Sequence, residues 1–331
     1  MTYRDFPKVE LHLHLDCSLS FEVARQIRPG LSREEYEENF IAPPKCTDLA
    51  DYISRAVKGF ELMQTPEQLR LVTLDLFRQL REDRVVYAEI RFAPLLHTQQ
   101  GLSPEQVVEA VLDASREGIR ESGVEARLIL CTLRRFDEQQ SLDTARLVEK
   151  YHGTLVAGLD IAGDEAGYPI DAHVKAFEFA LSRGIPCTAH AGEAKGAGSV
   201  WETLHHLHPR RIGHGVRSIE DEKLLDFIRE KGVHLEVCPT SNIQVDVFDR
   251  MEDHPVDLLF KSGLSLSINT DTRTISDTTL EKEYAKLENT FNWTPEHFRQ
   301  CNLQAITHAF APPEVKAHIR RLLTAAYASE T

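Results

Sequence analysis

Short apolar runs rich in β-branched residues alternate along the chain with longer segments of helical pattern. The apolar runs predict eight strands, at residues 9–15, 85–92, 126–133, 155–161, 186–191, 211–215, 234–238 and 264–269. The segments between them predict helices, for example at 104–122, 171–183, 219–231 and 256–261. Eight strands that alternate with helices predict an α/β fold, a single (β/α)8 TIM barrel. A doubly wound open sheet is the alternative that this pattern leaves open.

Two parts of the chain exceed a minimal barrel. A long segment separates the first two predicted strands, and residues 47–53 within it have the pattern of an amphipathic helix. Helical patterns also follow the last strand, at 295–310 and 314–327. Because no linker, repeat or low-complexity tract interrupts the sequence, we expect residues 1–331 to form one domain, with a helical insertion after the first strand and extra C-terminal helices.

Composition narrows the class of partner. The chain has 331 residues and a formal net charge of −14, which disfavours nucleic acid and anionic membranes as partners because both select basic surfaces. The six cysteines are scattered without a C-x-x-C pair, so neither a zinc ribbon nor a disulfide framework is expected. No signal peptide and no apolar run long enough to span a membrane is present, and we expect a soluble, cytoplasmic protein.

Candidate chemistry begins with His12 and His14 on the first predicted strand. Side chains two residues apart on a strand point to the same face, so the two imidazoles are placed to bind one metal ion. Such a pair alone is weak evidence, because two histidines also occur together on surface strands. Polar residues also end later predicted strands: Asp164 and Glu165, His190 and Glu193, His214, Asn242, and Asp271. The carboxyl ends of barrel strands form one rim, and the sequence therefore predicts a metal site there.

The donor types suggest both the metal and its use. Three imidazoles and a carboxylate, from His12, His14, His190 and Asp271, suit one zinc ion best, with iron, manganese and cobalt as alternatives. An open coordination position lowers the pKa of a bound water to about 7 and supplies hydroxide at neutral pH. We expect His214 to orient that hydroxide, Asp271 to accept its proton and Glu193 to act as a proton shuttle.

The motifs HLHLD, GDE, HAGE, GHG, CPTSN and NTD, in this order and spacing, resemble the adenosine deaminase family of metal-dependent amidohydrolases. The resemblance covers nearly the whole chain. It implies a zinc-bearing barrel that hydrolyses the 6-amino group of a purine to an oxo group and releases ammonia. The cysteine-rich motif of cytidine-type zinc deaminases is absent from the sequence.

The resemblance also implies roles for single residues. The zinc ligands would be His12, His14, His190 and Asp271, and the catalytic residues Glu193, which protonates a purine ring nitrogen, His214, which positions the hydroxide, and Asp271. The substrate-binding residues would be His14, Asp16 at the ribose, Gly163 through its backbone N–H, and Thr272. The predicted helix at 48–53 would form an apolar gate over the site. Asp16 favours a nucleoside over free adenine, because adenine-specific relatives tend to have glutamate there.

Two positions depart from the family pattern. Thr272 and Arg273 stand where the family commonly has an aspartate that binds the purine N7, followed by proline. Threonine still donates one hydrogen bond. For Arg273 we expect an ion pair with a nearby carboxylate such as Asp277, and contact with an anionic substrate group is the alternative. Cys17 replaces the usual glycine after Asp16, and we expect a buried small thiol.

The predicted function is zinc-dependent hydrolytic deamination of adenosine and deoxyadenosine. The first alternative is deamination of another 6-aminopurine nucleoside such as aminodeoxyfutalosine, motivated by Thr272 and Arg273. The second, from a different class, is a catalytically silent nucleoside-binding protein, although such a protein has no use for a proton shuttle at Glu193. The expected partner is a small purine nucleoside, with neither nucleic acid nor membrane, and the sequence does not predict the oligomeric state.

Overall fold

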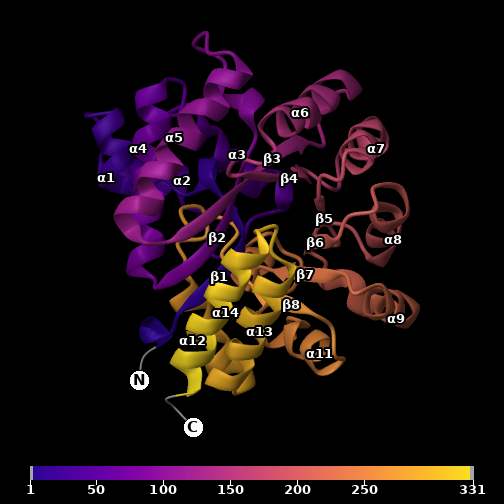
Figure 1. The fold of residues 1–331 in the computed structure, drawn as a ribbon. Helices are drawn as coiled ribbons and strands as arrows, with labels where there is room; N and C mark the ends of the chain where they lie inside the picture. Colours follow the sequence, from indigo (N-terminus) through magenta and orange to yellow (C-terminus); the bar gives the residue numbers. More distant parts are fainter. Residues whose placement is uncertain (1–2, 329–331) are drawn as a thin grey trace.

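The computed structural model describes residues 3–328, in which eight parallel strands alternate with helices (Figure 1). The strands are β1 (Lys8–His14), β2 (Val85–Phe92), β3 (Glu125–Leu133), β4 (Val156–Ala162), β5 (Thr188–Ala191), β6 (Arg211–His214), β7 (His234–Val237) and β8 (Leu266–Ile268). The α-helices are α1 (Phe21–Ile27), α2 (Arg33–Phe40), α3 (Leu49–Phe60), α4 (Pro66–Glu82), α5 (Pro104–Ser122), α6 (Glu138–Tyr151), α7 (Val174–Ser182), α8 (Ala197–His206), α9 (Glu222–Lys231), α10 (Pro239–Gln244), α11 (Val256–Lys261), α12 (Leu280–Phe291), α13 (Pro295–His308) and α14 (Pro313–Ala328).

The strands form a closed ring. Strands β1 to β4 pair in order as one parallel sheet and β5 to β8 as a second. Single parallel bridges join the two sheets at both seams, Leu159 to Cys187 between β4 and β5, and Leu13 to Asp271 beyond β8. At the second seam the Asp271 N–H donates to the His12 carbonyl at 3.0 Å, and the His14 N–H donates to the Asp271 carbonyl at 2.8 Å. The predicted barrel is confirmed, and the open-sheet alternative is wrong.

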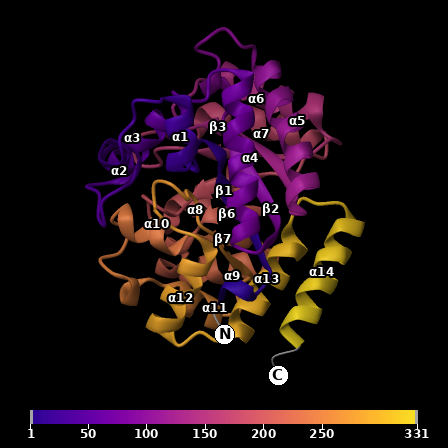
Figure 2. The same ribbon diagram turned by 90° about the vertical axis from the view of Figure 1, so that its left-hand side faces the viewer.

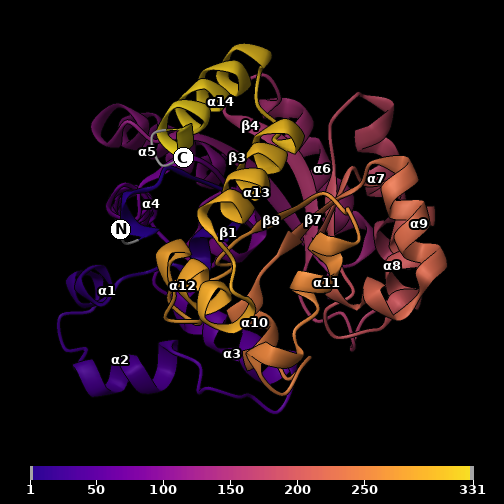
Figure 3. The same ribbon diagram turned by 90° about the horizontal axis from the view of Figure 1, so that it is seen from below.

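The segments outside the repeating units lie in two places. Helices α1, α2 and α3 from the insertion after β1 lie on one side of the molecule, and α14 lies on the opposite side (Figure 2). Seen from below, α12 and α13 lie next to β1 and β8, and α14 packs against α13 further out (Figure 3). The short 3-10 helix Leu15–Cys17 directly follows β1, and α3 of the insertion contacts it. The insertion therefore covers the carboxyl ends of the strands.

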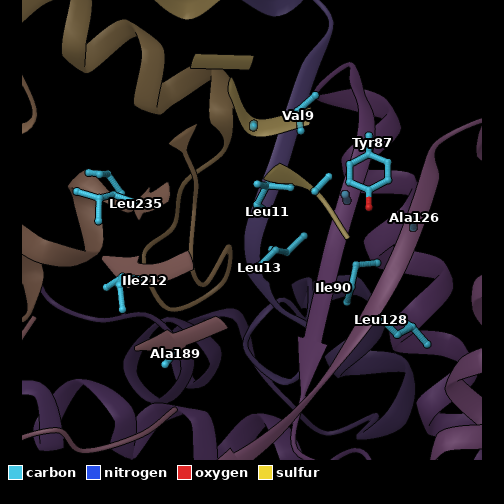
Figure 4. Packing of buried hydrophobic residues seen from close by; sticks show 14 of the residues in the cluster. Val9, Leu11, Leu13, Tyr87, Ile90, Ala126, Leu128, Ala189, Ile212 and Leu235 are labelled. Atoms are coloured by element: carbon cyan, nitrogen blue, oxygen red, sulfur yellow. The ribbon is translucent and has the colours of Figure 1, made fainter. Parts of the chain in front are cut away.

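Alternation along strand β2 separates an apolar layer from a polar interior. Ala88 and Ile90 of β2 are buried in the apolar core, where Figure 4 labels Ile90. The residues that alternate with them, Glu89 and Arg91, are also fully buried but form ion pairs with other strands. Because successive strand side chains point to opposite faces, one strand supplies both the packing layer and the polar layer.

The barrel interior contains a network of buried ion pairs. The Arg91 guanidinium on β2 donates to Asp160 on β4 at 2.8 Å and to Glu236 on β7 at 2.7 Å. Arg211 on β6 pairs with Glu236 at 2.7 Å and with Glu89 on β2 at 2.5 Å. All these side chains are fully buried. Since a buried charge is costly without a partner, these pairs link strands across the barrel.

Several predicted bounds differ from the structure at element ends. The predicted helix at 171–183 is a 3-10 turn, Asp171–His173, followed by α7, and the one at 219–231 begins as α9 only after Asp221 caps it. The predicted helix at 47–53 is the longer α3, whose first turn is capped by the Asp48 carboxylate. Strand β8 is shorter than predicted, because the chain turns away after Ile268 to present Asp271. Among residues 3–328, no helix is both long and apolar enough to cross a membrane.

The buried network gives a prediction about stability. Arg91→Met removes the shared partner of Asp160 and Glu236, and we expect the free energy of unfolding in urea to fall by about 3–5 kcal/mol, since the buried Asp160 loses its guanidinium partner and Glu236 keeps only its pair with Arg211. The control Arg146→Met breaks a surface pair with Asp143 and should change it by less than about 0.5 kcal/mol. Equal small losses in both variants would contradict this account.

Candidate metal centre and substrate cavity

Four side chains from opposite seams of the barrel meet at the carboxyl ends of the strands. The Asp271 Oδ1 lies 3.3 Å from His12 Nε2 and 3.4 Å from His14 Nε2. His190 Nε2 lies 3.2 Å from His14 Nε2. The structure thus brings together all four residues that the sequence predicts as metal ligands.

Buried carboxylates orient two of these imidazoles. Glu236 lies 2.9 Å from His12 Nδ1, and Asp160 lies 3.2 Å from His190 Nδ1. Because a carboxylate accepts hydrogen bonds, the proton of each ring lies on Nδ1 and the lone pair on Nε2 points into the site. His12 Nε2 is buried and has no hydrogen-bond partner among residues 3–328. An imidazole lone pair that is fixed and unpartnered in this way fits a metal ligand.

His214 has the opposite tautomer to His12 and His190. A chain of hydrogen bonds that begins at a backbone amide fixes it. The Val256 N–H donates to His254 Nδ1 at 3.1 Å, so His254 donates from Nε2 to the Asn242 Oδ1 at 3.2 Å. The Asn242 amide nitrogen in turn donates to His214 Nδ1 at 3.1 Å. Burial lowers the pKa of His254 to about 3, so this ring stays neutral and the direction of the chain is fixed. The His214 proton is therefore on Nε2.

This tautomer bears on the choice of metal ligands. One atom from each of His12, His190, His214 and Asp271 lies within 4.8 Å of the other three, so this set also has metal-binding geometry. His214, however, has a proton on Nε2, and its Nδ1 accepts from Asn242, so neither nitrogen offers a free lone pair. The lone-pair argument favours His14 as the fourth ligand and leaves His214 as a donor beside the site.

The net charge of the ion-pair network and the adjoining site also favours a bound cation. The network and the adjoining site contain the carboxylates of Glu89, Asp160, Glu236 and Asp271, but only the guanidinium groups of Arg91 and Arg211. Burial alone would raise the pKa of Asp271, but the nearby imidazoles of His12, His214 and His14 hold it well below its usual range. The excess of two negative charges matches one divalent ion.

Glu193 and His214 lie side by side next to this centre. The Glu193 Oε2 lies 3.5 Å from His214 Nε2, and its Oε1 is buried without a hydrogen-bond partner in the described part of the chain. Burial, with the charges of Asp271 and Glu165, raises the pKa of Glu193 well above its usual range. A carboxyl group whose pKa is raised holds its proton more tightly and is better suited to act as an acid. His214 and Asp271 both have a φ of +62°, a strained backbone that is typical of functional sites.

A cavity of about 270 Å³ opens beside these groups. Its inner wall includes the predicted residues His14, Asp16, Gly163, Glu193, His214, Asp271 and Thr272. The outer wall is the apolar face of α3, with Leu49, Ile53, Ala56 and Phe60. A mostly apolar cavity with a few polar groups at one end is typical of a small-molecule site. The helix predicted as an apolar gate lines the cavity.

The comparison with known sequences is consistent along the whole chain. The sequence model of the adenosine deaminase family matches residues 7–326. The chain belongs to the adenosine deaminase family. An adenosine deaminase of Enterococcus faecalis is 36% identical over 331 residues, covering 98% of each chain. An adenosine deaminase of Clostridium acetobutylicum is 34% identical, covering 96% of this chain and 97% of that protein.

Solved structures show the same fold as this family member. An adenine deaminase from Arthrobacter aurescens has a TM-score of 0.89 at 26% identity and covers 96% of this chain and 98% of its own. A zinc-bound amidohydrolase from Burkholderia ambifaria has a TM-score of 0.90 at 23% identity, covering 99% and 92%. Arabidopsis ADAL in complex with IMP has a TM-score of 0.87 at 22% identity, covering 99% of each chain.

In this member of the adenosine deaminase family, Arg273 forms ion pairs, as predicted, but with other carboxylates than Asp277. The Arg273 guanidinium is buried and donates to Glu10 at 2.7 Å and to Asp83 at 2.9 Å, whereas Asp277 pairs with Lys282. The predicted ion pair with a carboxylate is confirmed, and Asp277 as its partner is wrong, because the turn after β8 directs Arg273 toward β1 and the end of α4. Arg273 also does not line the cavity. Contact with an anionic substrate group has no support.

Thr272 and Cys17, the other departures from the family pattern, both line the cavity. The Thr272 hydroxyl contacts the Tyr52 hydroxyl of α3 at 2.5 Å and Ser276 at 3.3 Å. At the position where the family pattern has an aspartate, this chain thus has the Thr272 hydroxyl within a cluster of neutral hydroxyl groups. Cys17 is a buried thiol, as expected, and its Sγ lies 3.7 Å from the Asp16 carboxylate. Burial raises the pKa of Asp16 to about 6.

The groups that orient the ligands were not predicted. Asp160, Arg91 and Glu236 all lie within predicted strands, and the motifs assign them no role. The available signal was a charged residue in the middle of an otherwise apolar strand, which is rarely buried without a partner. Asn242 was predicted only as a polar residue at a strand end, and His254 was not predicted, since their connection to His214 exists only in the folded chain.

The hydrogen-bond chain behind His214 gives a second prediction. In protein labelled with 15N-histidine, the ring nitrogens of His214 should report a single tautomer with the proton on Nε2. His254→Leu removes the donor to Asn242, frees the amide to rotate, and should give a mixture of tautomers. His205→Leu on the surface of α8 is the control and should leave the His214 signals unchanged. A wild-type His214 with its proton on Nδ1 would contradict the assignment.

Proposed function

We propose that the protein deaminates adenosine and deoxyadenosine hydrolytically to inosine and deoxyinosine, with release of ammonia. The observation that carries the proposal is the convergence of three imidazole nitrogens and a carboxylate beside the buried Glu193 carboxyl, at the end of an apolar cavity. Relatives that share about a third of their residues with this chain over its whole length are adenosine deaminases. The enzyme class that follows is adenosine deaminase, EC 3.5.4.4.

The resident metal in this proposal is one zinc ion per chain, held by His12, His14, His190 and Asp271. Three nitrogen donors and one carboxylate oxygen form a set that zinc prefers. A zinc ion bound there supplies Lewis-acid activation of a water molecule at neutral pH. Asp160 and Glu236 would hold the two inner imidazoles in the orientation that this requires.

The remaining side chains divide the work of proton transfer and orientation. Glu193 donates its proton to a ring nitrogen of the purine, which makes the amine-bearing carbon more electrophilic. His214 directs its Nε2 proton toward the attacking oxygen and orients it, while Asp271 accepts the proton that this oxygen loses. The proton that Asp271 accepts passes to the amino group, which leaves as ammonia, and Glu193 regains a proton as the hydroxyl on the ring carbon becomes the oxo group. The α3 helix covers the cavity and limits access of bulk water.

The cavity favours a neutral nucleoside. Asp16 lies in its wall and is suited to accept a hydrogen bond from a ribose hydroxyl, and Gly163, with a φ of +100°, exposes its backbone to the ligand. Because Arg273 is committed to Glu10 and Asp83, the main reason to prefer a substrate with an anionic substituent is lost. The intact set of Glu193, His214 and four metal donors also argues against a silent binding protein.

Other parts of the proposal concern the setting. We expect one domain in residues 1–331 and a small purine nucleoside as the partner, with no role for nucleic acid at a net charge of −14. All six cysteines are free and buried, as is usual in a reducing compartment, which supports a cytoplasmic location.

A substrate panel tests the proposed function. Zinc-replete enzyme should convert adenosine and deoxyadenosine, followed by the loss of adenine absorbance, with kcat/KM at least tenfold above that for adenine, AMP and aminodeoxyfutalosine. The physical reason is that Asp16 in the cavity wall can accept a hydrogen bond from a ribose hydroxyl, whereas Arg273 is paired with Glu10 and Asp83 and is not available to an anionic group. No turnover of either adenosine substrate would refute the proposal, and a preference for aminodeoxyfutalosine would replace it with the alternative.

Glu193→Gln tests the role of the acid. The amide has the same shape but cannot donate a carboxyl proton, and we expect kcat to fall by about 10²–10⁴-fold with KM for adenosine changed by less than about threefold. Zinc content should stay the same as in the wild type, because Glu193 is not a ligand. Unchanged kcat in this variant would contradict the assignment.

A further inference from the structure

Glu165 directly follows the cavity residue Asp164 in the chain. Its side chain is 1% exposed and accepts five hydrogen bonds. Four come from consecutive backbone amides, of Gly192 at 2.7 Å, Glu193 at 3.0 Å, Ala194 at 2.7 Å and Lys195 at 3.0 Å. The fifth comes from the Ser199 hydroxyl at 2.6 Å. Among residues 3–328 this buried carboxylate has no ion pair within 4.0 Å, and backbone N–H groups provide four of its five hydrogen bonds.

These amides belong to the loop that carries the proposed acid. The loop leaves β5 after His190, passes through Glu193 and enters α8, whose N-terminal residue is Ala197. Gly192 adopts a φ of +70°, and a Cβ there would lie 2.5 Å from the Val200 side chain. The turn is therefore tight, and all its amides point to one side, which leaves the Glu193 side chain on the other side, toward the cavity.

The Glu193 carboxyl itself has little to hold it. Its Oε1 is buried without a hydrogen-bond partner in residues 3–328, and its Oε2 lies 3.5 Å from the Nε2 of the neutral His214. The direction of the acid thus depends on the backbone from which it projects. That backbone is fixed by the Glu165 carboxylate from the neighbouring strand end, in one contiguous set of hydrogen bonds.

We propose that Glu165 is a positioning residue for the reaction, which fixes the Gly192–Lys195 backbone so that the Glu193 carboxyl points at the substrate. The effect of Glu165 on kcat rests on the proposed function, whereas its effect on the loop rests on the structure alone. Arg134 supports the same arrangement from β3, since its guanidinium donates to the His190 carbonyl at 2.9 Å. Glu165 thus acts through Glu193 and does not itself touch the reacting atoms.

The test is Glu165→Gln. In this variant an amide NH2 replaces one acceptor oxygen, so a hydrogen-bond donor faces backbone N–H groups that are themselves donors. Misplacement of a catalytic group by about 1 Å costs on the order of 10²-fold in rate. We therefore expect kcat for adenosine to fall by about 10²-fold, with KM changed by less than about threefold. The second readout is amide hydrogen exchange, which should be faster at residues 192–195 than in the wild type, whatever the substrate of the enzyme.

The matched control is Glu220→Gln. Glu220 also bonds an amide beside this loop, that of Ala197 at 3.3 Å, but from the solvent side and paired with Arg217. This variant should keep kcat within about twofold and leave exchange at 192–195 unchanged. Equal losses of kcat in the two variants would overturn the proposal, because they would indicate general loosening of the loop.

Ser199→Ala serves if Glu165→Gln does not fold. It removes one hydrogen bond to Glu165 and leaves the four amides in place, and we expect kcat to fall severalfold at constant KM, with faster exchange at Gly192. Wild-type kcat and wild-type exchange in this variant would overturn the proposal. If the wild-type enzyme turns over none of the nucleosides, the proposed function fails, while exchange at 192–195 still decides the role of Glu165.

Discussion

The structure depends on how the barrel interior accommodates charge. Arg91 and Arg211 pair with Glu89, Asp160 and Glu236 at full burial, and two of these carboxylates also accept from the inner imidazoles, His12 and His190. A buried carboxylate without partners would be very costly, so each of these groups needs the others. The same interactions that make the polar interior stable also direct two Nε2 lone pairs at one point. Stability and metal binding therefore share a single network.

Orientation by hydrogen bonds then extends outward from this network. His12 and His190 are held by carboxylates, and His214 is held by a neutral chain that begins at the Val256 amide and passes through His254 and Asn242. The nature of the partner decides the tautomer: a carboxylate places the proton on Nδ1, whereas an amide donor places it on Nε2. Imidazoles at one rim thus acquire different functions, because the groups behind them differ. Glu165 fixes Glu193 by the same principle, through backbone amides.

Strand periodicity was enough to predict the barrel, the strand order and the four converging donors, since His12, His14, His190 and Asp271 all follow from the ends of predicted strands. Three features could not be predicted. The partner of Arg273 depends on the turn after β8, which directs it to Glu10 and Asp83 instead of Asp277. The connection of His254 to His214 spans separate segments. The seams at β4–β5 and β8–β1 rest on single bridges, which no local pattern encodes.

The central claim is that His12, His14, His190 and Asp271 together hold one divalent cation, with His214 outside its coordination shell. Anomalous diffraction at the zinc absorption edge from crystals of the zinc-replete protein tests it most directly. We expect one strong peak about 2.0–2.2 Å from the Nε2 atoms of the three histidines and from an Asp271 carboxylate oxygen, with His214 Nε2 beyond bonding distance. A peak coordinated by His214 in place of His14, or no peak at this rim, would contradict the account.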